Sequence, residues 1–278
     1  MKVALVIQAR CGSTRLPQKI LKPLGGVPLL QRMVERVEQG VSMLRQQFGS
    51  SASYETIIAT TTDSVDQAIT RIAEELNIRC YCGHSTDLLD RHLQAARAAE
   101  ADVVVKIPSD CPLIDPAVVC RVISTYINVR RSADYVSNLH PASYPDGNDV
   151  EVMPIHVLEQ AWHEAERPYE RQHTTPFIWE RPERFRLVNV SWETGLDYSM
   201  SHRWTIDYPE DYEFIRMVFK HLWNPDRTFS LEEILALLDA HPSIAQVNAQ
   251  YAGVNWYRHH LDELKTVDRS RTRIPEES

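Results

Sequence analysis

The chain has 278 residues, of which 43% are hydrophobic and 24% charged, and its formal net charge is −8. This composition predicts a globular protein with one substantial core and disfavours a broad nucleic-acid-binding surface. No apolar run reaches the roughly 18–20 residues of a membrane-spanning helix, and the amino terminus resembles no signal peptide. We therefore expect a cytoplasmic protein with neither a membrane nor a nucleic-acid partner. The five cysteines lack the paired spacing of zinc sites and are expected to be reduced thiols.

The positive charge is concentrated near the amino terminus. Residues 1–50 hold eight basic and two acidic side chains, a net of +6 in a chain whose total is −8. A local basic cluster of this size suits a small, highly charged anion better than a nucleic-acid strand. The sequence therefore predicts an anion site in this segment.

Apolar runs of strand length alternate with segments of helical period over residues 2–135. Helices are expected at about 30–44, at 65–76 after a capping box of Ser64 and Gln67, at 87–99, and from Asp115 and Pro116 onward. The expected strands between them are 3–8, 56–60, 79–81, 103–107 and 135–137. This alternation predicts an α/β fold whose mainly parallel sheet is covered by helices on both faces and binds ligands beyond the carboxyl ends of its strands.

The second half of the chain follows a different pattern. Turns at 140–149 precede a short strand at 149–154, helices through Trp162 and Phe177, and a strand at 185–190. We expect a mixed lobe over 139–222 without a flexible linker before it. A helical tail at 223–268, with a capping box at Ser230 and Glu233, is expected to precede a disordered end at 269–278.

Three cations follow the first strand directly, in the stretch QARCGSTRLPQK. Arg10, Arg15 and Lys19 accompany a turn through Gly12 and Ser13, where backbone N–H groups are free. Fixed N–H donors together with Arg and Lys charge are how proteins hold phosphate groups, although the spacing does not match a Walker A motif. A solvated basic loop is the alternative.

Two aspartates are candidates for a metal site. Asp110 follows the strand of VVVKIPSDCPLIDP, at the same sheet edge as the basic loop, and Asp207 precedes the helix start of RWTIDYPEDYEF. A hard dication on a nucleotide takes one or two protein carboxylates and completes its shell with phosphate and water oxygens. A loop aspartate that caps a turn is the alternative for Asp110, and Glu210 and Asp211 are assigned to the helix start.

Seven segments together resemble the cytidylyltransferases that activate acidic sugars, most closely the spore-coat-polysaccharide branch, which is related to the acylneuraminate and deoxy-octulosonate enzymes. In order, they are IQARCGSTRLPQKIL, LGGVPLLQRMVER, IIATTTDSVDQAI, SDCPLIDP, YPDGNDVEV, YERQHTTPFI and RWTIDYPEDYEF. Two departures stand out: Gln18 occupies a position where many relatives have glycine, and Pro108 and Ser109 replace a small Thr-Gly pair.

The resemblance implies a nucleotide-diphospho-sugar transferase fold of the GT-A-like, Rossmann-related kind over 1–222, with 1–138 as the nucleotide-binding half and 139–222 as the acceptor-side and dimerisation half. It implies a homodimer that converts CTP and an acidic sugar into a CMP-sugar and pyrophosphate with Mg²⁺, for cell-surface polysaccharide or related biosynthesis. Arg10, Lys19, Asp110 and Asp207 would be catalytic, and Asp110 and Asp207 would hold the metal. The implied nucleotide-binding residues are Gln8, Ala9, Arg10, Gly12, Ser13, Arg15, Lys19, Thr60, Thr61, Asp63, Ser109 and Asp110.

Polar clusters of the second half supply acceptor-binding candidates. These are Asp149, Glu151, Arg171, His173 and Arg203. They could bind hydroxyls or a carboxylate, and Arg171 suits a planar anion. A structural hydrogen-bonding role is the alternative for His173.

Several other functions remain open at this stage. The same nucleotide site would serve another nucleotidyltransferase, a phosphonate cytidylyltransferase, or a glycosyltransferase that consumes a ready-made nucleotide sugar. A non-catalytic nucleotide-binding regulatory module is the alternative outside the enzymes, but the basic residues and both candidate metal carboxylates are present together, which argues against it.

Overall fold

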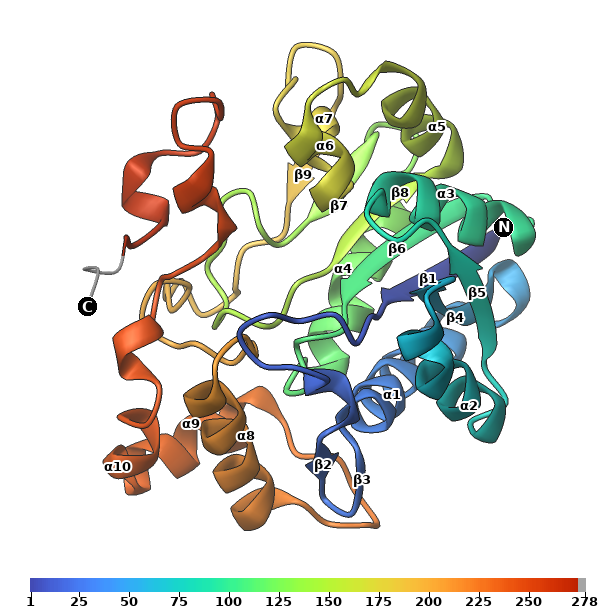
Figure 1. The fold of residues 1–278 in the computed structure, drawn as a ribbon. Coiled ribbons are helices and arrows are strands. Elements are labelled where there is room, and N and C mark those ends of the chain that lie inside the picture. The colour runs from blue at the N-terminus through green and yellow to red at the C-terminus, as the bar shows by residue number, and fades with distance from the viewer. Residues whose placement is uncertain (275–278) are drawn as a thin grey trace.

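Seven strands form the central sheet of the computed structural model, which describes residues 1–274 (Figure 1). Four neighbouring strands, in the order β5-β4-β1-β6, run parallel, β8 is antiparallel to both β6 and β7, and β9 is parallel to β7. The bounds are β1 Lys2–Gln8, β4 Ser53–Thr61, β5 Arg79–Gly83, β6 Val103–Pro108, β7 Tyr135–Ser137, β8 Glu151–Pro154 and β9 Leu187–Asn189. The predicted α/β fold with a mainly parallel sheet is confirmed.

Helices cover both faces of this sheet because alternate side chains of the inner strands are apolar. In β1, Val3, Leu5 and Ile7 pack into one core, and Ala4 and Val6 pack into the other. The first core is completed by α1 (Leu29–Phe48), α2 (Gln67–Glu75) and α4 (Pro116–Val129), and the second by α3 (Leu88–Ala98) and α5 (Ile155–Glu164). The hairpin β2 (Pro23–Leu24) and β3 (Val27–Pro28) precedes α1.

Two predicted helix starts, at Asp87 and at Asp115, are confirmed because each aspartate side chain caps its helix. The Asp87 carboxylate accepts from the Asp90 N–H at 2.9 Å, and Asp115 accepts from the Ala117 N–H at 2.6 Å. The predicted capping box of Ser64 and Gln67 is wrong, because residues 64–66 form a 3-10 turn before α2. Val65, the first residue of the predicted helix, is 50% exposed. Asp66 turns inward instead and accepts hydrogen bonds from the Cys11 N–H and the Thr61 hydroxyl.

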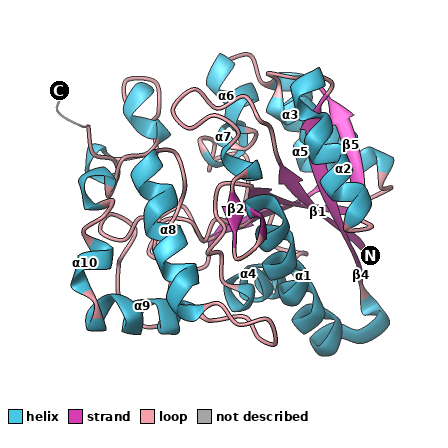
Figure 2. Cartoon of the chain, turned by 60° about the horizontal axis from the view of Figure 1, so that its bottom comes forward, coloured by secondary structure: helices cyan, strands magenta, loops and turns pink. Residues whose placement is uncertain are grey.

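The later helices fall into two groups. Helices α6 (Pro168–His173) and α7 (Pro176–Trp179) pack with α3 and α5 in the second core, whereas Figure 2 shows α8 (Pro209–Leu222), α9 (Leu231–Ala240) and α10 (Pro242–Ala245) grouped away from β1 and β4. The predicted capping box is present at α9, where Ser230 and Glu233 each accept from the other's backbone N–H. Within residues 1–274, no helix combines the length and the apolar character needed to cross a bilayer.

The end of the chain folds back across the molecule, and Figure 1 shows this red segment opposite α6 and α7. Residues 269–271 form a 3-10 turn, Thr272 is buried, and the Arg273 N–H donates to the Gly253 carbonyl at 2.7 Å. The Asn255 side chain also donates to the Arg271 carbonyl at 2.8 Å. The prediction of disorder is therefore wrong for 269–274, because backbone hydrogen bonds fasten this segment, while 275–278 lie outside the described residues.

Candidate active site

The basic loop leaves β1 at the carboxyl edge of the sheet and is fastened from below. The Ala9 N–H donates to the Ala59 carbonyl at 3.0 Å, and the Cys11 N–H donates to the buried carboxylate of Asp66 at 2.6 Å. A Cβ built on Gly12 would meet nothing within 4 Å, so the backbone there borders open space. The loop thus presents uncovered backbone next to Arg10, as an anion cradle requires.

Gln18 takes a backbone conformation that favours glycine. Its φ is 54° and its ψ 31°, in the left-handed region, and its N–H donates to the Cys11 carbonyl at 3.2 Å. A side chain in this region costs about 1 kcal/mol relative to glycine. The loop accepts this cost and keeps the turn that brings Lys19 to the start of its 3-10 helix, Lys19–Leu21.

Lys19 lies between the two predicted metal carboxylates. Its Nζ is 2.9 Å from an Asp110 carboxylate oxygen, 3.2 Å from an Asp207 carboxylate oxygen, and 2.7 Å from the Ile206 carbonyl oxygen. Burial favours the neutral amine, but the two carboxylates outweigh it and raise the pKa of Lys19. For Asp207, burial is in turn outweighed by Lys19, Arg15 and Arg203, which lower its pKa. Lys19 and Asp207 are therefore both charged at neutral pH.

Backbone contacts hold Asp207 beside Asp110 across nearly 100 residues of sequence. The Ile206 N–H donates to the Asp110 carbonyl at 2.8 Å, and the Asp207 N–H donates to the Asp211 carboxylate at 2.8 Å. Asp211 is fully buried at the start of α8. The prediction that Asp211 belongs to the helix start is confirmed, and its carboxylate also orients Asp207.

Arg203 anchors this arrangement from inside the protein. It is 3% exposed, and its guanidinium contacts Asp211 at 2.9 Å, Asp207 at 3.1 Å and the Val254 carbonyl at 2.7 Å. Arg203 borders the cavity described next, but its donors are taken up by the protein. The structure thus favours a positioning role over the predicted acceptor-binding role.

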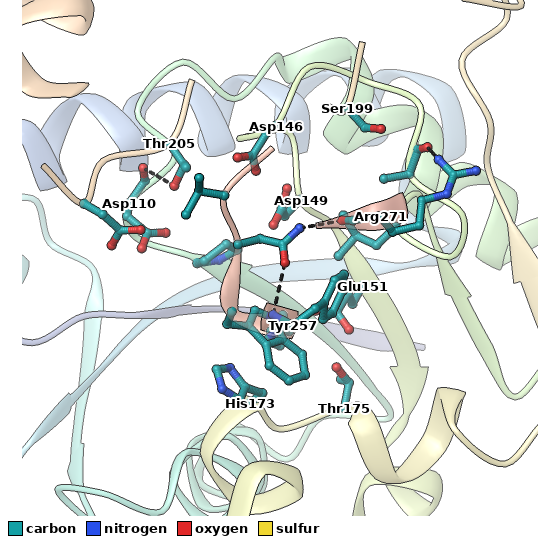
Figure 3. A pocket seen from close by; sticks show the side chains of 18 of the residues that line it. Asp110, Asp146, Asp149, Glu151, His173, Thr175, Ser199, Thr205, Tyr257 and Arg271 are labelled. Carbon is teal, nitrogen blue, oxygen red and sulfur yellow. Dashed lines mark hydrogen bonds and ion pairs between the residues drawn. The ribbon is translucent and has the colours of Figure 1, made fainter. Parts of the chain in front are cut away.

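A single cavity of about 1000 Å³ collects most of the predicted site residues, and Figure 3 shows part of it. The predicted residues that line it are Gln8, Ala9, Arg10, Gly12, Ser13, Arg15, Lys19, Ser109, Asp110, Asp149, Glu151, His173, Arg203 and Asp207. The basic loop and the acceptor-side candidates therefore border one continuous space, as a group-transfer site requires.

Four predicted site residues do not line this cavity: Thr60, Thr61, Asp63 and Arg171. Thr60 is fully buried, and the Thr61 hydroxyl donates to Asp66, so the threonines support the basic loop from beneath. Arg171 donates to the Asp87 carboxylate at 2.6 Å and to the Trp162 carbonyl at 3.0 Å. Arg171 thus joins α6 to α3 and α5, and the prediction that it binds the acceptor has no geometric support.

Arg91 is a cavity residue that the sequence analysis missed. It is 1% exposed, donates to the His84 carbonyl at 3.0 Å, and its Nε has no partner among the described residues. Burial and the neighbouring Arg10 lower the pKa of Arg91 to about 10. An arginine between the apolar residues Leu89 and Leu93 of the predicted helix could have indicated it, since all three side chains are buried.

The tail was missed as well. Its segment 253–260 lines the cavity, and the Trp256 ring stacks on the His173 ring with centroids 3.8 Å apart. Burial lowers the pKa of His173 to about 3, so this ring is neutral at pH 7. Aromatic residues in a tail are ordinary core formers, and the pair of Trp256 and Tyr257 gave no indication of a site more than 200 residues from the basic loop.

Three carboxyl groups and two aromatic rings border the cavity from the turn before β8, from β8 and from the tail, and we call this set the acceptor wall: Asp146, Asp149, Glu151, Trp256 and Tyr257. Figure 3 labels the three carboxyl groups and Tyr257. Glu151 is 2% exposed, forms an ion pair with Lys106, and accepts from the Tyr135 hydroxyl at 2.5 Å. Burial and nearby carboxylates raise the pKa of Asp149 to about 6.

Gly147 makes the turn of this wall possible. Its φ is +111°, and a Cβ there would lie 2.8 Å from the backbone of Trp204. Trp204 itself is fully buried and does not line the cavity.

Comparison with known proteins identifies the family. The cytidylyltransferase family model matches residues 4–254. The chain belongs to the cytidylyltransferase family. This cytidylyltransferase is 31% identical over 251 residues to an uncharacterized protein of Methanocaldococcus jannaschii, an alignment covering 90% of this chain and 95% of that protein. It is 29% identical over 253 residues to the spore coat polysaccharide biosynthesis protein SpsF of Bacillus subtilis, covering 87% and 96%.

A solved cytidylyltransferase from Leptospira borgpetersenii superposes with a TM-score of 0.78 at 29% identity, covering 88% of this cytidylyltransferase and 97% of that chain. The predicted family and fold are confirmed, and the protein is a nucleotidyltransferase. The cavity lies beyond the carboxyl ends of β1 and β6, where open parallel α/β sheets bind their ligands.

Proposed function

We propose that this cytidylyltransferase transfers the CMP group of CTP to a hydroxyl of a sugar-like acceptor and releases pyrophosphate, in a reaction that requires Mg²⁺. The observation that carries the proposal is Lys19, which lies within 3.2 Å of both Asp110 and Asp207 at the sheet edge that also bears the basic loop. The name of the Bacillus subtilis relative favours a role in cell-surface polysaccharide biosynthesis.

The basic loop would bind the triphosphate. Three cationic side chains line the cavity there: Arg10, Arg15 and Lys19. The backbone of Gly12 and Ser13 borders it as well. We add Arg91 to this group, because its unpartnered Nε is buried at the cavity next to Arg10. Fixed donors of this kind stabilise charge without reorganising during the reaction.

Asp110 and Asp207 would hold the metal. Carboxylate oxygens are the donors that Mg²⁺ takes, and both groups already contact one cation, the Lys19 ammonium. No set of three or more His, Cys, Asp or Glu side chains in residues 1–274 is arranged to hold a metal, so phosphate oxygens and water would complete the shell. When bound, Mg²⁺ would supply positive charge at the phosphate oxygens.

The chain's own residues would orient an in-line displacement. The acceptor oxygen forms a bond to the α-phosphorus, the bond from that phosphorus to the bridging oxygen breaks, and the acceptor hydroxyl loses its proton. Lys19 and Arg10 would stabilise the negative charge that gathers on the departing pyrophosphate. The acceptor wall, which borders the same cavity, would hold the attacking hydroxyl.

The test is a pyrophosphate-release assay with CTP, UTP, GTP and ATP and a panel of neutral, amine-bearing and acidic sugars in Mg²⁺. We expect release with CTP and loss of release when Mg²⁺ is chelated. A glycosyltransferase would instead consume a ready-made nucleotide sugar and release a nucleotide. Failure of CTP to bind, measured by calorimetry, would overturn the proposal.

We also retain a homodimer and a cytoplasmic location as proposals. All five cysteines are free thiols in the structure, which suits a reducing compartment. Sedimentation velocity at micromolar concentration would measure the assembly, and a single monomer species would overturn the dimer.

A further inference from the structure

The tail brings one arginine to the cavity without an ion pair. Arg258 lies in the 3-10 turn Trp256–His259, is partly buried and lines the cavity. Its Nη1 donates to the Asn255 carbonyl oxygen at 2.5 Å, and it forms no ion pair with any carboxylate among residues 1–274. Its other N–H groups make no hydrogen bond to the described residues either. Most donors of this guanidinium are therefore available to a ligand.

The turn that bears Arg258 is fixed in position. The Asn255 side chain accepts from the Tyr257 N–H at 3.0 Å and so begins the turn. The residue before it, Val254, accepts at its carbonyl from Arg203 at 2.7 Å, and the same guanidinium lies 3.1 Å from the Asp207 carboxylate. One buried arginine thus joins the base of the turn to a carboxylate of the proposed metal site.

The tail also meets the basic loop, at Tyr208. The Tyr208 ring stacks on the Tyr251 ring of the tail, with centroids 3.8 Å apart. The Tyr208 hydroxyl accepts from Arg15 at 3.1 Å, and the Arg15 guanidinium lies 5.0 Å from the centroid of the same ring. An arginine of the loop and a segment of the tail are therefore held against one side chain.

Arg15 and Arg258 lie near enough to repel each other across the cavity that both line. Burial and the positive charges of Arg15 and Arg203 lower the pKa of Arg258. Arginine nevertheless stays protonated at neutral pH. An anion bound between the two guanidinium groups would relieve their repulsion.

The carboxylate of Asp207 does not supply that anion, because three other cations already share it. Its oxygens lie 3.1 Å from Arg203, 3.2 Å from Lys19 and 3.3 Å from Arg15. Arg258 is outside this set, so positive charge is left over where the loop meets the tail. Paired arginines suit phosphate well, since each presents several N–H donors in a planar fork.

We propose that Arg258 binds the outer phosphates of the nucleotide together with Arg15, and that the tail thereby completes the triphosphate site. The guanidinium would donate to phosphate oxygens of bound CTP and to the same oxygens in the departing pyrophosphate. The inference rests on the proposed function and deepens it. It adds a residue that lies beyond the family match at 4–254.

Calorimetry with CTP and CMP in Mg²⁺ tests the assignment, because the two nucleotides differ only in the outer phosphates. Arg258→Gln should weaken the binding of CTP by about tenfold or more, as expected when charge-assisted hydrogen bonds are lost. The affinity for CMP should change by about twofold or less, since CMP has no outer phosphate. Arg258→Lys, which keeps the charge without the planar fork, should recover part of the loss.

Arg269→Gln is the matched control. This arginine also belongs to the tail, but it does not line the cavity, and its contact with Asp262 at 3.6 Å is exposed. The control should leave the affinities for CTP and CMP unchanged. Urea unfolding of each variant checks that the tail substitutions leave the fold intact.

The pyrophosphate-release assay separates the nucleotide from an anion on the acceptor. If Arg258→Gln raises the KM for the acceptor and leaves the affinity for CTP unchanged, the inference is overturned and Arg258 belongs to the acceptor. Equal weakening of CTP and CMP would also overturn it, since the outer phosphates would not be the ligand. These outcomes leave the proposed function standing, whereas failure of the wild type to bind CTP would remove both.

Discussion

The two ends of the cavity are built in opposite ways. The proposed nucleotide end comes mainly from one contiguous segment, residues 8–19, which continues from β1. The proposed acceptor end is assembled from the turn at 145–149, from β8, from α6 and from the tail. One is basic and exposes backbone, whereas the other is acidic and aromatic. Function at the first end follows from local sequence, and function at the second depends on which segments the fold brings together.

Asp110→Asn should have the largest effect, because it removes one of the two carboxylates that are proposed to hold the metal. We expect turnover to fall by at least about 1000-fold with any acceptor, since phosphoryl transfer depends on charge neutralisation at the phosphates. Pyrophosphate release measures this, and circular dichroism checks that the fold is intact. Full activity in this variant would remove Asp110 from the proposed metal site.

Lys19→Met should lower kcat by about 100-fold, because it deletes the cation between Asp110 and Asp207. Lys19→Arg, which keeps the charge but changes its shape, should recover part of the loss. The loss should be the same for every acceptor if Lys19 serves the nucleotide end alone. A change in acceptor preference would show that Lys19 also acts on the acceptor.

Arg203→Met tests whether Arg203 anchors Asp207 and Asp211, and the measured quantity is the free energy of unfolding. The variant leaves Asp211 buried without its partner, which costs about 3–5 kcal/mol in the free energy of unfolding. Urea unfolding measures this, and Arg216→Met is the control because its ion pair with Glu213 is exposed. Equal stability of Arg203→Met and the wild type would contradict the anchoring role.

Trp256→Ala should weaken binding of the acceptor without weakening binding of CTP. Removing the ring that stacks on His173 should raise the KM for the acceptor by about tenfold. The dissociation constant of CTP should stay within a factor of two or so. A loss of CTP affinity as large as the loss for the acceptor would show that Trp256 serves both ends.

Asp149→Asn should have the smallest effect, and it depends on pH. The native pKa of Asp149, about 6, lies above its ordinary value of 3.8, so the proton stabilises the native state. This contribution is complete below about pH 4 and is lost as the pH rises through 6. At pH 7.5 the variant should therefore melt about 2–4 °C above the wild type, and at pH 4 the two should coincide. A difference that does not vary between these pH values would contradict the raised pKa.

The nucleotide end was largely predictable because its parts are local. Strand β1 followed by Arg10, Gly12 and Lys19 already predicts an anion site at a sheet edge. Two predictions failed because contacts with residues distant in sequence outweighed the local pattern. The Ser64 cap did not form because Asp66 is held beneath the basic loop, and Arg171 was claimed by Asp87 of another helix.

The sequence by itself determined the order of strands and helices, the parallel sheet and the cationic loop, since periodicity, capping and turn chemistry act over a few residues. Only the tertiary structure decided that Asp207 meets Asp110 through Lys19, that Arg203 is buried among carboxylates, and that the tail completes the acceptor wall. Lys19 alone joins segments 91 and 188 residues away from it. The energies of such contacts depend on burial and on which charges end up paired, and neither is fixed until the chain has folded.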